Sequence, residues 1–283
     1  MHVGGMLRAA IVVDYDSGPA LGACVRSLQG QVDAIVVVDN ASREPAQQRL
    51  AAAGVDLSSL VLIRNSENRG FAAACNQGLV ALPAEVVLFV NPDCVLPEGA
   101  VARLCATLQS DPKIGMVGPR LVGPDGREQW GGRREFPGVL AGLRRMIGRR
   151  PSGMPGGEAV SSPIDVPAIS GACMAVRRDA CAAVGVWDEG FFLHCEDLDW
   201  CRRFWLAGWR VVFDPAVSVL HEKGVCSRSR PWFVEWHKHR GMWRFYRKYE
   251  GRSGWGSVFA PVVALGIAGH FLLACIKRAG HGS

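Results

Sequence analysis

The strongest constraint on the fold is the alternation of short apolar runs with helical segments along the first half of the chain. Runs rich in Ile, Val, Leu and Phe cover Ala9–Tyr15, Ala34–Asp39, Leu60–Arg64, Val86–Val90 and Ile114–Val117. Helical patterns fill the intervals at Pro19–Leu28, Pro45–Ala53, Phe71–Leu82 and Gly99–Leu108. Apolar strands that alternate with helices are typical of a parallel sheet with helices on both faces. The pattern predicts an α/β fold with a mostly parallel central sheet.

Polar residues follow each of the first four predicted strands. The strand endings read Asp14-Tyr15-Asp16, Asp39-Asn40, Asn65-Ser66 and Asn91-Pro92-Asp93. The carboxyl ends of parallel strands share one edge of the sheet, which is where such folds bind ligands. We therefore expect a binding site at that edge. The absence of GxGxxG after the first strand argues against a classical dinucleotide dehydrogenase, and the absence of GxxxxGK[ST] excludes a P-loop nucleotidase.

The cysteines and the N-terminus indicate a cytosolic protein. The chain has 283 residues and 10 Cys, but no CxxC pair that would suggest a zinc or thioredoxin-like site. Most of these cysteines have apolar neighbours, so we expect reduced, buried thiols. Met1–Arg8 contains no long apolar stretch, which predicts that there is no secretory signal.

Basic residues gather in two regions, although the net charge is only +6. One is Arg133–Arg150 and the other is His221–Arg252, and either nucleic acid or an anionic membrane could attract them. The apolar segment Ser257–Ile276 follows, and a helix of that length spans the hydrocarbon core of a bilayer, about 30 Å. Pro261 and His270 leave a buried core helix as the alternative. We expect membrane contact on the cytoplasmic side and no nucleic-acid partner.

Six motifs occur in the order of a known family. They are VVDNAS, NRGFAAACNQG, FVNPDC, SGACMAVRR, WDEGFFLHCEDLDWCRR and VLHEKG, within Ala9–Tyr249. In this order the chain resembles glycosyltransferase family 2, and most closely the bacterial rhamnosyltransferases that extend a polyprenyl-diphosphate-linked sugar. The resemblance implies a Rossmann-like GT-A fold over residues 1–225, with a nucleotide-sugar half at about 9–120 and an acceptor half at about 121–225. Residues 226–283 would form a basic aromatic helix and an apolar, membrane-associated tail.

The resemblance also assigns donor-binding residues. Asp39 would accept the imide N–H of a pyrimidine, with an Asx turn as the alternative role. Tyr15 would stack on the base, with a rim aromatic that covers the sheet as the alternative. Arg69, at a loop-to-helix junction, suits a phosphate or ribose contact, with a helix cap and a solvated side chain as the alternative. The remaining residues of the predicted nucleotide-sugar site are Asn68, Gly70, Asn76 and Asn91.

A divalent cation is expected beside the leaving diphosphate. Asn91-Pro92-Asp93 occupies the place of the family's Asp-x-Asp motif, so Asp93 supplies the full carboxylate, and His221 matches a further ligand. Mg²⁺ or Mn²⁺ suits such oxygen-rich coordination. A structural histidine is the alternative for His221.

The catalytic carboxylates are expected at the start of a helix over Asp197–Ala207. Asp197 matches the family's general base, which takes the proton of the acceptor hydroxyl, and Glu196 is the second candidate. Simple helix capping is the alternative for both. The acceptor side would include Gly171, Ala172, Trp187 and Asp188, and Arg202 is a candidate diphosphate contact.

These expectations describe an inverting glycosyltransferase at the cytoplasmic face of a bacterial plasma membrane, attached peripherally or by a single C-terminal segment. Its donor would be dTDP-rhamnose, with UDP-galactofuranose, UDP-glucose and UDP-GlcNAc as alternatives, and its acceptor a polyprenyl-diphosphate-linked saccharide. A homodimer is left open. A nucleotidyltransferase would need a Gly-rich basic loop after the first strand, which DYDSGPA lacks. A non-catalytic nucleotide-sugar-binding scaffold at the membrane is the remaining alternative.

Overall fold

The apolar runs of the first half form strands as the sequence predicts. They are β1 (Arg8–Asp14), β2 (Ala34–Asp39), β3 (Leu60–Arg64), β4 (Val86–Val90) and β6 (Ile114–Val122). The computed structural model describes residues 7–138, 160–222, 224, 230–252 and 254–279. The Arg-rich positions 144, 145, 149 and 150 lie outside the described residues. Within the described part, β1 to β4 pair in parallel in the order β3-β2-β1-β4.

Strands from the second half of the chain complete a nine-stranded mixed sheet. These are β5 (Cys94–Val95), β8 (Ile164–Asp165), β10 (Cys173–Arg177) and β11 (Arg210–His221). The order continues from β4 through β10, β6 and β11 to β5, and β8 pairs with β11. β10 runs antiparallel to both of its neighbours, whereas β6 and β11 are parallel. A separate small sheet pairs β7 (Arg133–Arg134) with β9 (Ala168–Ile169).

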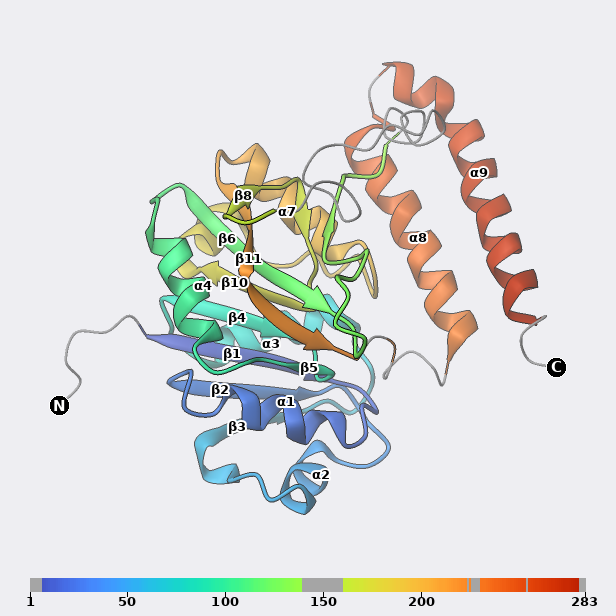
Figure 1. Cartoon of the computed structure of the whole chain (residues 1–283). Coiled ribbons are helices and arrows are strands. Elements are labelled where there is room, and N and C mark those ends of the chain that lie inside the picture. The colour runs from blue at the N-terminus through green and yellow to red at the C-terminus, as the bar shows by residue number, and fades with distance from the viewer. Residues whose placement is uncertain (1–6, 139–159, 223, 225–229, 253, 280–283) are drawn as a thin grey trace.

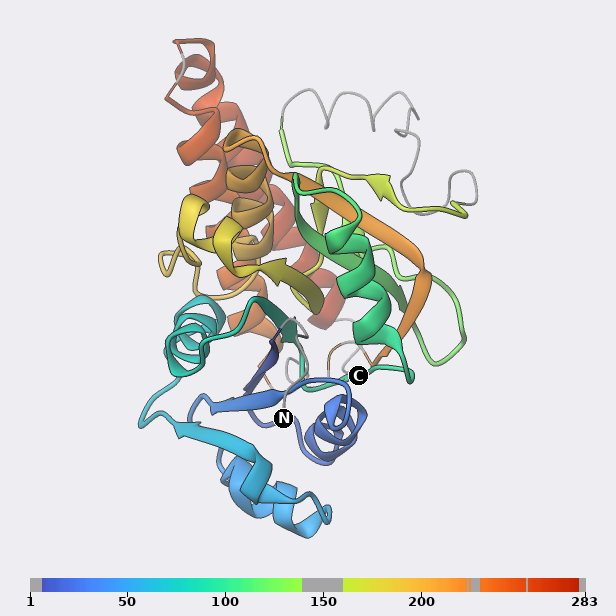
Figure 2. The same cartoon turned by 90° about the vertical axis from the view of Figure 1, so that its left-hand side faces the viewer.

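Helices cover both faces of the large sheet (Figures 1 and 2). Alternate residues of β1 point to opposite faces, so Ile11 and Val13 belong to one apolar cluster and Ala10 and Val12 to the other. The first cluster includes α3 (Phe71–Ala81), α6 (Arg178–Val184) and α7 (Glu196–Leu206). The second includes α1 (Ala20–Leu28), α2 (Ala46–Ala52) and α4 (Ala100–Gln109). A short 3-10 helix, η1 (Leu57–Ser59), precedes β3.

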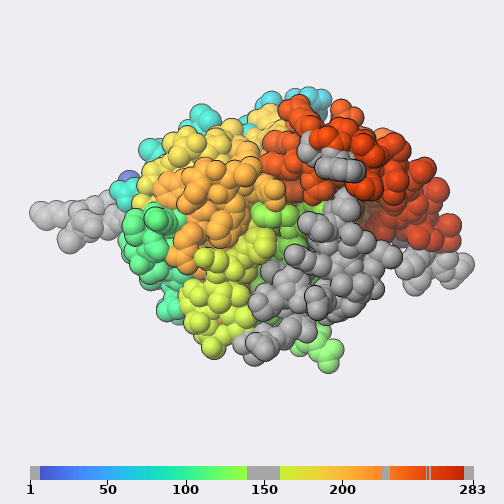
Figure 3. All heavy atoms as spheres, turned by 90° about the horizontal axis from the view of Figure 1, so that it is seen from above, coloured from blue at the N-terminus to red at the C-terminus, as the bar shows by residue number. Residues whose placement is uncertain are grey.

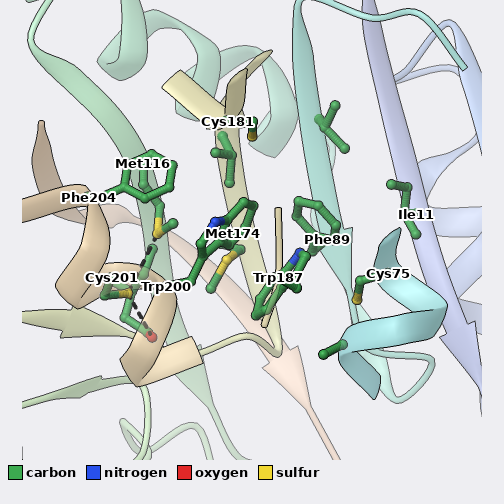
Figure 4. Packing of buried hydrophobic residues seen from close by; sticks show 14 of the residues in the cluster. Ile11, Cys75, Phe89, Met116, Met174, Cys181, Trp187, Trp200, Cys201 and Phe204 are labelled. Carbon is green, nitrogen blue, oxygen red and sulfur yellow. Dashed lines mark hydrogen bonds between the residues drawn. The ribbon is translucent and has the colours of Figure 1, made fainter. Parts of the chain in front are cut away.

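Large aromatic side chains fill the space between the sheet and α7 (Figure 4). The ring of Phe89 on β4 meets the ring of Trp200 on α7 edge-on, with centroids 5.3 Å apart. Trp187 lies against both rings, at 5.2 Å from Phe89 and 4.2 Å from Trp200. Burial of such side chains contributes about 1.5–3 kcal/mol each, so this layer holds the start of α7 firmly against the sheet.

Two C-terminal helices extend from the sheet domain. α8 (Pro231–Tyr249) lies between α9 (Gly254–Ala279) and the rest of the molecule (Figures 1 and 3). Ion pairs attach α8 to the domain, because Arg244 and Lys248 both reach Asp188, at 2.9 Å and 2.7 Å. Within the described part of the chain, α9 holds one stretch long and apolar enough to cross a membrane, Gly256–Ile276, and none of it is buried.

Candidate active site

The polar ends of the parallel strands come together at one edge of the sheet. The register places Asp14 beside Asp39 and Asp39 beside Arg64. Asn40 and Asn65, the residues after β2 and β3, are buried and linked by a side-chain hydrogen bond of 3.0 Å. The structure thus gathers the strand endings that the sequence singled out into one polar rim.

Asp39 is engaged with the backbone of its own loop. Its Oδ1 accepts the Ser42 N–H at 2.8 Å, and its Oδ2 accepts the Ala46 N–H at 3.0 Å, at the start of α2. The Arg64 guanidinium lies 3.4 Å from Oδ2. The alternative that the sequence analysis gave for Asp39 was an Asx turn, and the carboxylate does bond backbone N–H groups of its own loop, three and seven residues further on. A pyrimidine would have to use the remaining lone pairs of a carboxylate that is already bonded.

A buried ion pair beneath this rim escaped the sequence analysis. Asp14, fully buried at the end of β1, pairs with Arg49 of α2 and accepts a hydrogen bond from the Ser42 hydroxyl at 2.8 Å. The two charges are 35 residues apart in sequence, so no local motif connects them. The pair fixes the β1 and β2 endings relative to each other.

The loop before α3 is shaped by Asn68 and Gly70. Asn68 Oδ1 accepts the Gly70 N–H at 2.9 Å and the Asn40 side-chain amide at 2.9 Å. Gly70 has φ +86°, and a Cβ there would lie 2.7 Å from the Phe192 carbonyl oxygen, so only glycine fits. Arg69 is exposed, and among the described residues its guanidinium has no hydrogen-bond partner. It is available for an anionic ligand.

Two predicted site residues lie elsewhere than expected. The ring of Trp187, which we expected at the acceptor side, is 1% exposed and belongs to the aromatic core, so it offers no surface to an acceptor. Asn76, predicted in the donor site, instead bonds the Trp187 backbone in both directions at 3.0 Å and donates to Glu189. Both residues connect α3 to the segment that precedes α7.

Asp93 and His221 meet as the metal hypothesis requires. The antiparallel pairing of β5 with β11 brings His221 beside Cys94, and His221 Nε2 lies 3.4 Å from Asp93 Oδ1. That oxygen is buried and accepts no hydrogen bond within the described structure. Gln129 holds the histidine, because its Oε1 lies 2.7 Å from His221 Nδ1 and its Nε2 donates to the His221 carbonyl. An Nδ1–H donor leaves the lone pair of Nε2 for a cation.

Cys94 completes this group geometrically, since one ligand atom from each of Asp93, Cys94 and His221 lies within 4.8 Å of the others. Burial, however, raises the pKa of the Cys94 thiol well above its ordinary value. The protonated thiol donates to the Ala172 carbonyl at 3.3 Å. The donors that fit a hard divalent cation are therefore the carboxylate of Asp93 and the imidazole of His221.

The segment Ser170–Ala172 contacts both the segment of the metal candidates and the start of α7. On one side, the Ala172 carbonyl accepts the Asn91 N–H at 2.8 Å. On the other, the Gly171 N–H donates to Asp197 Oδ2 at 3.0 Å. A Cβ on Gly171 would lie 3.4 Å from the Cβ of Asp197, which is an ordinary contact distance. This short stretch of backbone thus bonds both to the segment that holds Asp93, through Asn91 and Cys94, and to Asp197.

Glu196 and Asp197 open α7, as predicted. The turn that presents them is unusual, because His194 and Cys195 both have φ +68°, a left-handed conformation that non-glycine residues rarely adopt. Burial and the neighbouring Asp197 charge raise the pKa of Glu196 to about 8. Glu196 Oε2 has no hydrogen-bond partner among the described residues. At neutral pH Glu196 therefore holds a proton.

Arg134 is the main partner of Asp197 that the sequence analysis missed. The sequence analysis treated Arg133 and Arg134 as part of a basic run that could attract an anionic partner. In the structure each of them pairs with a carboxylate of the chain itself. Arg133 pairs with Glu128 at 2.8 Å and lies over the Phe213 ring. Arg134 forms an ion pair with Asp197. Arg134 and Asp197 are 63 positions apart in the sequence, so no local pattern signals their contact.

Three further predicted residues contact C-terminal elements. Asp188, expected at the acceptor side, binds Arg244 and Lys248 of α8. Arg202, the diphosphate candidate, has its guanidinium over the rings of Phe136 at 5.0 Å and Tyr249 at 5.4 Å. Tyr15, expected to stack on a base, has the Arg230 guanidinium 5.7 Å from its ring centroid.

The architecture resembles that of solved glycosyltransferases of the GT-A type. A structure titled GalNAc-T7 with UDP, GalNAc and Mn²⁺ superimposes with a TM-score of 0.64 at 17% identity, over 87% of this chain and 48% of that one. The mannosyltransferase PcManGT from Pyrobaculum calidifontis, in complex with GDP-Man and Mn²⁺, gives a TM-score of 0.60 at 17% identity over 98% and 76%. The protein therefore has a GT-A-like glycosyltransferase fold.

A sequence model of glycosyl transferase family 2 matches residues 9–185. The chain belongs to this family and is a glycosyltransferase. Among its relatives is the N-acetylglucosaminyl-diphospho-decaprenol L-rhamnosyltransferase of Mycobacterium tuberculosis, 27% identical over 87% of this chain and 85% of the relative. The rhamnosyltransferase WbbL of Escherichia coli is 38% identical over 23% of this chain and 24% of the relative.

Proposed function

We propose that this glycosyltransferase moves L-rhamnose from dTDP-rhamnose to a hydroxyl of a polyprenyl-diphosphate-linked saccharide during cell-envelope polysaccharide synthesis. The observation that carries the proposal is that Ser170–Ala172 bonds both to the segment that holds Asp93, through Asn91 and Cys94, and to the carboxylate of Asp197. A leaving diphosphate beside Asp93 and an acceptor hydroxyl beside Asp197 would then face the same anomeric carbon. The choice of rhamnose rests on the similarity to the mycobacterial rhamnosyltransferase.

Donor binding uses the rim at the carboxyl ends of β1 to β4. Arg69 is free to reach the diphosphate or the ribose, and Tyr15 and Asn91 lie at neighbouring strand endings. Because Asp39 is bonded to its own loop, its contribution is to shape the base site as well as to offer a remaining lone pair to the base.

Asp93 and His221 would hold a divalent cation, Mg²⁺ or Mn²⁺. The partnerless Oδ1 of Asp93 and the Nε2 that Gln129 leaves available fit such an ion. When bound, the ion supplies positive charge that stabilises the departing diphosphate. Arg69 is placed to share this role.

Asp197 acts as the general base. Its carboxylate takes the proton from the acceptor hydroxyl while that oxygen bonds to the anomeric carbon and the bond to the diphosphate breaks. A single displacement of this kind inverts the anomeric configuration. Glu196, which is protonated at neutral pH, is less suited to accept that proton.

The two C-terminal helices bring this site to a lipid-linked acceptor at the cytoplasmic membrane surface. α9 supplies an apolar stretch that contacts α8 on one side and has no buried residue, and Trp232 and Trp236 of α8 are 49% and 56% exposed. Tryptophan side chains favour the headgroup region of a bilayer. Arg244 and Lys248, which the sequence analysis assigned to the membrane, mainly attach α8 to Asp188, so fewer cations than expected remain for lipid.

A donor screen tests the proposal. The purified full chain in detergent would be given dTDP-rhamnose, UDP-galactofuranose, UDP-glucose or UDP-GlcNAc, with Mg²⁺ or Mn²⁺ and a short polyprenyl-diphosphate-saccharide. We expect transfer from dTDP-rhamnose with inversion, detected by mass spectrometry and NMR of the product. Transfer from a UDP-sugar alone would reject rhamnose as the donor. Nucleotide binding without transfer or hydrolysis of any donor would favour the non-catalytic scaffold.

A further inference from the structure

The two adjacent carboxylates at the start of α7 have unequal surroundings. Asp197 Oδ2 receives the Arg134 guanidinium and the Gly171 N–H, and Oδ1 receives the Leu198 N–H at 2.8 Å. Glu196 is equally buried, with 6% of its surface exposed against 8% for Asp197, yet its Oε2 has no such partner in the described structure. Solvent exposure therefore does not distinguish the two groups, whereas hydrogen bonds and charge do.

The small sheet of β7 and β9, with the residues directly after it, supplies both donors to Asp197. Arg134 pairs across this sheet with Ala168, and the chain continues from Ile169 directly into Ser170 and Gly171. The neighbouring Arg133, held by Glu128, fixes the same strand from its other side. The guanidinium and the Gly171 N–H thus reach Asp197 from β7 and from the residues directly after its partner strand β9.

We propose that Arg134 is a positioning residue that places the negative charge of the carboxylate pair on Asp197 rather than on Glu196. This inference rests on the proposed role of Asp197 as the base. Two adjacent carboxylates in a buried site are not both ionised at low cost, so the pair carries one charge near neutral pH. A contacting guanidinium favours the ionised form of a carboxylate by a factor of about 10 to 1,000. Arg134 gives this preference to Asp197.

Other ionisable groups around Glu196 and Asp197 have less influence on which of the two carboxylates carries the charge. Burial lowers the pKa of His194 to about 4, so its ring is neutral at physiological pH. Lys238 and Glu235 of α8 act on His194 with opposite signs. Burial raises the pKa of both the Cys195 and the Cys201 thiols to about 12, so neither is charged.

The test compares pH–rate profiles of the full-length protein in detergent. The variants are Arg134→Gln, Arg134→Lys, Glu196→Gln and the double variant Arg134→Gln/Glu196→Gln, with Arg127→Gln as a control. Arg127 is 89% exposed on the loop before β7, so its loss removes an arginine without touching the pair. Donor affinity, measured by calorimetry, reports whether each variant retains its folded donor site.

In Arg134→Gln we expect the acidic limb of the kcat profile to move to higher pH by about 1 to 3 units. Arg134→Lys should move it less. In the double variant the limb should still lie at higher pH than in Glu196→Gln, because the guanidinium contact with Asp197 is lost, but the movement should be smaller than Arg134→Gln causes when Glu196 is present, because the competing carboxyl is gone. A uniform loss of kcat with no movement of the limb, or the same movement with and without Glu196, would refute the inference.

The proposed role of Asp197 as the base and the proposed role of Arg134 can be rejected separately. Full transfer activity in Asp197→Asn would reject Asp197 as the base, and with it the proposed mechanism. An inactive Asp197→Asn together with an unmoved Arg134→Gln profile would reject only the role of Arg134.

Discussion

Glu196 should make the stability of this protein fall as the pH rises. Burial, together with the Asp197 charge, raises the pKa of this carboxyl from its ordinary value of 4.5 to about 8 in the folded state. Between these values the folded chain binds a proton that the unfolded chain has lost. The free energy of unfolding therefore decreases with rising pH across this window, and the loss is complete above about pH 8.

The size of the effect follows from the same interval. At about 1.4 kcal/mol for each pH unit, the interval between 4.5 and about 8 gives an upper limit of about 5 kcal/mol. Glu196→Gln keeps the shape of the side chain and removes its ionisation. The variant should match the natural protein near pH 5 and exceed it in stability by several kcal/mol near pH 9.

Urea unfolding, followed by tryptophan fluorescence in one detergent, measures this difference at both pH values. Trp187 and Trp200 are buried near the start of α7 and report its loss. Glu98→Gln is the matched control, because Glu98 is exposed and the same chemical change there should have little effect at either pH. A stability difference for Glu196→Gln that is equal at both pH values would refute the reasoning.

Three further predictions concern the site and the tail. Asp197→Asn should lower kcat by about 10²- to 10⁴-fold with nucleotide binding nearly intact, as steady-state rates and calorimetry would show, and unchanged rates would exclude it as the base. Gln129→Ala should weaken the activating metal by about 10- to 100-fold in a Mn²⁺ titration, whereas Asp93→Ala should abolish the metal-dependent part of nucleotide binding; full turnover in excess EDTA would contradict both. Truncation after Tyr249 should move the protein from the membrane to the soluble fraction while activity on a water-soluble acceptor remains, and a truncated chain that still sediments with membranes would count against attachment by α9.

Much of the architecture could be predicted from local patterns. β2, β3 and β4 have the bounds that their apolar runs predict, and α7 begins at the carboxylates that mark a helix start. These features depend on neighbours in sequence, through burial of apolar strands and favourable acidic residues at a helix N-terminus. The meeting of Asp93 with His221 was also predicted, although from the order of family motifs rather than from local chemistry.

The alternation of strands and helices, the polar strand endings and the apolar C-terminal segment can be predicted locally, because each depends on residues close together in the chain. The pairing of the charges depends on the tertiary fold. Arg134 meets Asp197, Arg49 meets Asp14, and Gln129 orients His221. The partners in each pair come from different elements, and the sheet order brings them together. Burial makes these pairings important for the fold, because a charge removed from water must be stabilised by the charged and hydrogen-bonding groups around it.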